Sequence, residues 1–93
     1  MKLTAEANLW YLFQFHSMPK LPQVSGKETV KALQKIGFTL AGQKGSHLKL
    51  IRVRDNQKQT LIVPMHKIIK KGTLRNGILK PISLSVAEFI KLL

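Results

Sequence analysis

Apolar residues recur along this chain first at helical spacing and then in alternation, and the change of period separates its elements. Ser25 and Glu28 form the pattern of a capping box, in which each side chain accepts a hydrogen bond from the other residue's backbone N–H. The apolar positions that follow at helical spacing are Val30, Leu33 and Ile36. This pattern predicts a helix that starts after Ser25 and ends at Gly37, with its lysines on the outer side.

Alternation of apolar and polar residues then predicts three strands. The first covers residues 38–41 and ends in Gly42, and the next two cover residues 48–54 and 59–63. The polar residues 55–58 between the last two strands predict a hairpin turn. We therefore expect a three-stranded antiparallel meander.

Pairing Arg54 with Gln59 across this turn sets the register of the last two strands. One face of the pair then carries an apolar set suited to a core, and Arg52 is expected to reach out at its edge. The core set is Leu48, Leu50, Leu61, Val63 and Met65. The same register places His47 directly opposite His66 on the open face of the sheet. The other opposed pairs on that face are Lys49 and Pro64, Ile51 and Ile62, and Val53 and Thr60.

The C-terminal part carries two further helix signals. Thr73 is expected to cap a helix that Pro81 ends, and Ser85 with Glu88 repeats the capping-box pattern before a last apolar run. The order is a helix, a three-stranded sheet, and a helix or helix pair. This order predicts an α+β domain whose sheet buries one face against helices.

Length and composition fit a single domain of 93 residues. Four of the six aromatic residues lie near the N-terminus, namely Trp10, Tyr11, Phe13 and Phe15. We expect an aromatic-rich extension over residues 1–20 and the folded domain over residues 21–93. The extension either docks on this domain or on a partner chain, or it precedes a natural start at Met18. We assign no role to His16, which lies within it.

The chain has no cysteine, no signal-peptide pattern and no apolar run near the roughly 18 residues that a spanning helix needs. These features favour the reducing cytoplasm and predict no membrane partner. The formal charge of +12 comes from 16 Lys and Arg against four acids, and it indicates a nucleic-acid partner.

Candidate chemistry centres on Gly45-Ser46-His47, because histidine can both accept and donate a proton near neutral pH. Without cysteine and with a single Asp, the chain lacks a thiol nucleophile and a pair of aspartates. Its three scattered histidines and four acids show no metal-ligand spacing. We therefore expect neither a metal site nor a cofactor.

An ordered series of motifs over residues 21–93 resembles the HicA toxins, small mRNA interferases of toxin–antitoxin pairs. The segments are Leu21-Pro22, Ser25 to Glu28, Leu33, Gly37-Phe38, Gln43 to His47, Val63-Pro64, His66, Lys70 to Leu74, and Leu84-Ser85 to Phe89. The resemblance implies a double-stranded-RNA-binding-like fold of order α-β-β-β-α, with the helices on one face of a three-stranded antiparallel sheet. It also implies the toxin component of a type II toxin–antitoxin system, mRNA cleavage, a HicB-like antitoxin partner and a catalytic histidine at His47.

A metal-free ribonuclease uses the 2′-hydroxyl of the RNA as its nucleophile, so it needs a base, an acid and cations near the charged phosphorus. We assign the general base to His47. His66 is either a second acid or base, a phosphate contact, or only a turn contact. The candidates for RNA binding are Lys44, Gly45, Ser46, Lys49, Lys67, Lys70, Lys71 and Thr73. The last three precede or open a helix, whose N-terminus favours an anion.

Other functions stay open on the sequence alone. The chief alternative is a non-catalytic RNA-binding module of the same fold, which would not arrest growth when expressed. DNA binding is less well supported, because no helix-turn-helix pattern is present. Apolar Ile51, Val53 and Ile62 are expected beside His47, where either an acidic antitoxin or the segment 10–15 could cover them.

Overall fold

The structure is a computed structural model that describes residues 19–93. The aromatic cluster and His16, which the sequence places in an extension over residues 1–20, lie outside the described residues. Helix α2 (Gly26–Gln34) opens the domain. Both halves of its predicted capping box form, since Ser25 Oγ accepts from Glu28 N and Glu28 Oε1 accepts from Ser25 N, each at 3.0 Å. The hydrogen bonds from Ser25 hold the pKa of the Glu28 carboxyl below its ordinary value.

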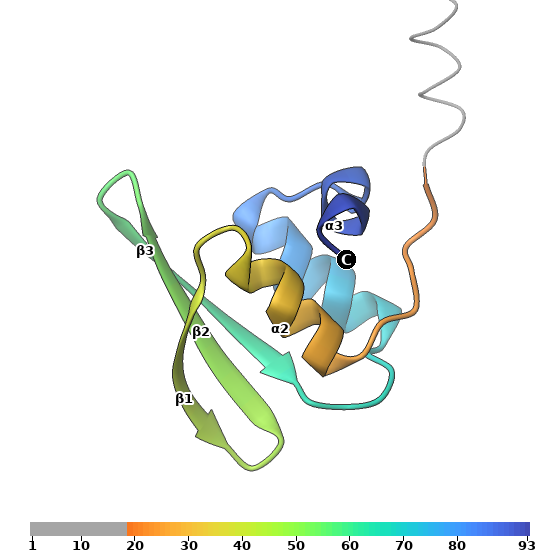
Figure 1. Cartoon of the computed structure of the whole chain (residues 1–93), viewed down its shortest axis with the longest axis horizontal. Coiled ribbons are helices and arrows are strands. Elements are labelled where there is room, and N and C mark those ends of the chain that lie inside the picture. The colour runs from red at the N-terminus through yellow and green to blue at the C-terminus, as the bar shows by residue number, and fades with distance from the viewer. Residues whose placement is uncertain (1–18) are drawn as a thin grey trace, which may run out of the picture.

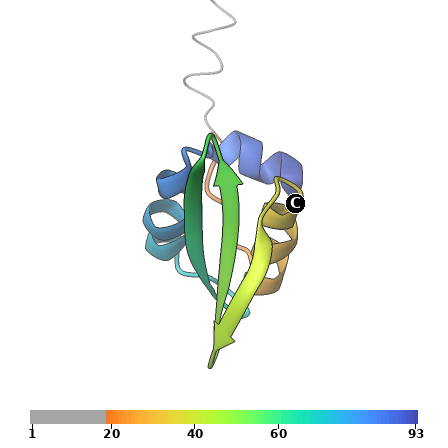
Figure 2. The same cartoon turned by 90° about the vertical axis from the view of Figure 1, so that its left-hand side faces the viewer.

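A three-stranded antiparallel sheet follows α2, with the strands in the order β1-β2-β3. The strands are β1 (Thr39–Lys44), β2 (His47–Arg54) and β3 (Gln57–Pro64). The helices cover one face of this sheet (Figure 1), and the other face is uncovered among the described residues (Figure 2). The predicted α+β class and element order are confirmed.

The core lies between the covered face of the sheet and the helices. It contains Leu48, Leu50, Leu61 and Val63 from the predicted face of the sheet, while Met65 is half-buried against it. The helices contribute Leu33, Leu74, Ile78 and Phe89, which are all fully buried. Apolar burial of this kind is the main force that holds the helices on the sheet.

The register of β2 and β3 differs from the prediction by two residues. Arg54 pairs with Gln57 rather than Gln59, because the turn consists of only Asp55 and Asn56. Both have positive φ, 51° and 61°, as in the type I′ turn that matches the twist of a hairpin. A shift of two preserves which side chains face the core but changes every opposed pair. The observed pairs on the open face are Lys49 with Ile62, Ile51 with Thr60, and Val53 with Lys58, and the exposed His47 pairs with Pro64, which is buried.

Strand β1 is longer than predicted, because it continues through Gly42 to Lys44. It does so by a bulge, since Leu40 pairs with Leu50 but Gly42, rather than Ala41, pairs with Lys49. The extra residue exchanges the two faces of β1 beyond the bulge.

The C-terminal helices depart from the prediction at Thr73 and Pro81. Thr73 does not cap a helix, because helical turns already begin at Lys71 and Leu74 N–H donates to Lys70 O. Helix η1 (Thr73–Leu79) is a π-helix, and η2 (Lys80–Ile82) continues it as a 3₁₀ turn through Pro81.

The last helix, α3 (Val86–Leu92), starts with the second predicted capping box, between Ser85 and Glu88. Both predicted capping boxes are therefore present in the fold. Within residues 19–93, every helix is too short or too polar to cross a bilayer.

Candidate functional site

His47 is the first residue of β2 and follows a tight two-residue turn. The turn is Gly45-Ser46, and its glycine has φ of 58°. A positive φ at the first of two central residues is typical of a type II′ hairpin turn, which favours glycine there. The His47 side chain is exposed on the open face of the sheet, and its strand partner is Lys44. The turn thus presents an imidazole and an ammonium group side by side.

His66 lies in the loop after β3, also exposed. The prediction that it stands directly opposite His47 is wrong, since Pro64 occupies that position. The two rings are nevertheless close, with centroids 6.4 Å apart and planes inclined by 67°. A backbone hydrogen bond of 2.6 Å from Met65 N to Ser46 O ties the loop to the turn that precedes His47. The structure therefore brings both histidines together through the loop rather than through the strand register.

Helix α2 supports the loop from the other side, through Gly26. Its backbone N–H donates to His66 O at 2.9 Å. A Cβ atom at this position would lie 2.2 Å from Pro64 O and 2.7 Å from Met65 Cα. Only a residue without a side chain allows the helix to approach the loop so closely. The sequence shows Gly26 merely as a member of the capping box, and nothing in its spacing indicates this contact.

The lysines predicted to bind RNA fall into two groups, all of them exposed. Lys44 and Lys49 pair with His47 and Ile62, respectively, across the open face of the sheet, and Lys67 directly follows His66. The second group, Lys70 and Lys71, comes after Ile69, whose N–H donates to Val24 O at 2.8 Å, and the candidate Thr73 follows it. They belong to the start of the next helix rather than to the sheet.

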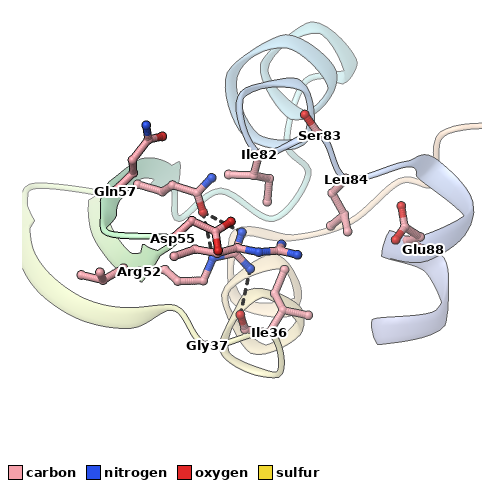
Figure 3. A pocket seen from close by; sticks show the side chains of 12 residues that line it. Ile36, Gly37, Arg52, Asp55, Gln57, Ile82, Ser83, Leu84 and Glu88 are labelled. Atoms are coloured by element: carbon pink, nitrogen blue, oxygen red, sulfur yellow. Dashed lines mark hydrogen bonds between the residues drawn. The ribbon is translucent and has the colours of Figure 1, made fainter.

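A cleft lies near the β2–β3 turn, at the opposite end of β2 from the histidines (Figure 3). Arg52 crosses it, and its Nε and Nη2 donate to Gln59 Oε1 at 2.9 and 2.6 Å while its Nη1 donates to Ile36 O at 2.9 Å. Its guanidinium also stacks on Phe38, with Cζ 4.5 Å from the ring centroid. Burial and the positive charge of Arg54 lower the pKa of this guanidinium. Arg52 was expected to extend outward from the core edge, but these bonds hold it against the core.

The described residues offer no group of three or more His, Cys, Asp or Glu side chains that could hold a metal ion. The site consists instead of two imidazoles, neighbouring ammonium groups and the free backbone of a glycine turn. Such a set can move protons and stabilise negative charge.

A comparison with protein families finds a match for this domain. Residues 26–81, more than half of the chain, match the family described as "HicA toxin of bacterial toxin-antitoxin". The matched segment runs from the first residue of α2 through all three strands to Pro81, and it includes both histidines. Comparisons with curated proteins and with solved structures gave no match.

Proposed function

Because the chain belongs to the HicA toxin family of bacterial toxin–antitoxin systems, whose members are known as mRNA interferases, we propose that it cleaves mRNA without a metal ion, with His47 as general base. The observation that carries this proposal is the exposed pair of imidazoles with centroids 6.4 Å apart. The pair lies within the matched segment and beside Lys44. We place the activity in the cytoplasm, where mRNA is translated.

The reaction needs two proton transfers. His47 accepts the proton of the 2′-hydroxyl, whose oxygen forms a bond to the adjacent phosphorus. The bond from phosphorus to the 5′-oxygen then breaks, and His66 gives a proton to that leaving oxygen. The products are a 2′,3′-cyclic phosphate and a 5′-hydroxyl. The reaction consumes no cofactor, since the RNA supplies the nucleophile and imidazoles supply the proton transfers.

The cations have a separate role in this proposal. Lys44 pairs with His47, Lys49 follows it on the same face of β2, and Lys67 directly follows His66. These lysines stabilise the extra negative charge on the phosphorus oxygens. The backbone of Gly45 and Ser46 is open enough for a close approach of the phosphate. Lys70, Lys71 and Thr73 are further candidates for contacts with phosphates farther along the RNA strand.

Membership of the family implies an antitoxin partner. We propose an acidic, HicB-like antitoxin that covers the open face of the sheet and blocks RNA by occlusion. Exposed apolar side chains lie among lysines there: Val53 is 71% exposed and Ile62 is 47% exposed. A partner with acidic and apolar groups would match both features.

Incubation of the purified full chain with bare RNA in the presence of EDTA tests the proposal. We expect RNA fragments to accumulate, because the reaction uses imidazoles rather than a metal ion. Binding that weakens with salt but leaves the RNA intact would instead identify a non-catalytic RNA-binding module. Cleavage that stops with EDTA and returns with a divalent cation would contradict metal independence.

A further inference from the structure

A hollow of about 680 Å³ lies on the open face of the sheet beside His47. Among the residues around it are Gly42, Lys44, His47, Lys49 and Ile62. We call it the Gly42 hollow. Its size falls in the range of roughly 300–1,000 Å³ that is usual for small-ligand pockets.

The bulge in β1 creates this hollow. Without the extra residue, Ala41 would pair with Lys49 and Gln43 with His47; with it, Gly42 and Lys44 take these places. Two cross-strand rows result, one of Gly42, Lys49 and Ile62 and one of Lys44, His47 and Pro64. The first row begins with a residue that has no side chain, so the surface between its neighbours is empty. A Cβ atom at Gly42 would meet nothing within 4 Å.

The chemistry of the Gly42 hollow fits one base of an RNA strand. Ile62 is 47% exposed and offers an apolar surface to the flat face of a base. His47 lines the same hollow. Lys44 and Lys49 also line the hollow and supply positive charge for the phosphates on either side of the base. Proteins bind single-stranded RNA by combining surfaces on which the bases stack with cations that contact the phosphates.

We infer that the Gly42 hollow binds the base of a nucleotide next to the phosphate that is cleaved. This inference rests on the proposed function, because the ligand is part of the RNA on which His47 acts. The hollow makes the enzyme prefer an unpaired base at that position, since a base in a duplex cannot leave the stack without losing its pairing.

The Gly42→Val variant tests the inference, since its side chain would project into the hollow from a position where an added Cβ meets nothing within 4 Å. Valine also suits a strand. We expect kcat/KM for a single-stranded oligonucleotide to fall by about tenfold or more, which is the usual effect of losing one base contact. The matched control is Thr60→Val, which puts the same side chain on the same face outside the hollow, opposite Ile51. The control should keep the kcat/KM of the wild type, and a Gly42→Val variant that also keeps it would overturn the inference.

A binding measurement separates this inference from catalysis. Nucleoside 5′-monophosphates have no internucleotide bond to cleave, and ribose 5-phosphate lacks the base. In an NMR titration of the full chain, we expect the monophosphates to shift the amide signals of Gly42, Lys49 and Ile62 more than ribose 5-phosphate does. Equal shifts would show a phosphate site without a base site and contradict the inference. If the chain binds the monophosphates but does not cleave RNA, the proposed function is contradicted, whereas base binding in the Gly42 hollow is supported.

Discussion

The His47→Ala variant is expected to cleave bare RNA about 10²–10⁴-fold more slowly than the wild-type chain at saturating RNA, the usual contribution of a general base. The fold should survive, because the side chain is exposed and the backbone of His47 keeps its pairing with Lys44 and Pro64. Binding to RNA should remain and should still weaken with salt, since it depends on the lysines. Single-turnover cleavage and a thermal melt of the same preparation measure both effects.

His66→Ala is the comparison that assigns the second imidazole. If His66 is a general acid, its loss lowers the cleavage rate at saturating RNA. If His66 is a phosphate contact, its loss raises KM and leaves that rate unchanged. Both histidines must matter to the rate if the 6.4 Å pair works as a unit. Undiminished cleavage by His47→Ala would contradict the assignment of the base.

Gly26→Ala is expected to destabilise the domain by about 1–3 kcal/mol, the usual cost of forcing an extra group into a packed site. The reason is the approach of α2 to the loop, where the new Cβ would lie 2.2 Å from Pro64 O. The helix or the loop must move, and the hydrogen bond from Gly26 N to His66 O lies at the point of contact. Each kcal/mol lowers Tm by about 4–8 °C in a domain of this size, so a thermal melt resolves the effect.

Gly77→Ala is the matched control, because it makes the same change at a helical glycine with nothing within 4 Å of the new Cβ. Its free energy of unfolding should be unchanged or higher by about 0.5–1 kcal/mol, because alanine has less conformational freedom than glycine in the unfolded chain. If Gly26→Ala melts at or above the temperature of this control, the close packing of α2 on the loop is not a constraint on the fold.

The elements that rest on local chemistry could be predicted from the sequence. Both capping boxes form as their spacing indicates, because Ser25 with Glu28 and Ser85 with Glu88 need only one helical turn to meet. The faces of the strands were also predictable, since alternation alone determines which side chains of β2 and β3 are buried.

Pairing between strands was less accessible, because it depends on the backbone of two turns and one bulge. Positive φ at both Asp55 and Asn56 shortens the hairpin and moves its register by two residues. The bulge in β1 leaves no clear signal beyond Gly42 itself, yet it determines that Lys44 rather than Gln43 faces His47. The Gly42 hollow could therefore not be found from the sequence.

The candidate site was predictable as a set of residues but not as an arrangement. A histidine after Gly-Ser in a basic chain was visible, whereas the approach of His66 depends on contacts between segments distant in sequence. Ser46 accepts from Met65, and Gly26 donates to His66. Such long-range backbone contacts carry no periodic signal in the sequence.

In the proposed reaction, two imidazoles let the RNA attack its own phosphate. The most direct measurement compares two oligonucleotides that differ in a single 2′-hydroxyl, the one next to the bond that the purified chain cleaves, in the presence of EDTA. We expect the all-ribose strand to be cut to a 2′,3′-cyclic phosphate and a 5′-hydroxyl, and the strand with one 2′-deoxy nucleotide to stay intact at that bond. Equal cleavage of both strands, or a product with a 5′-phosphate, would contradict attack by the 2′-hydroxyl.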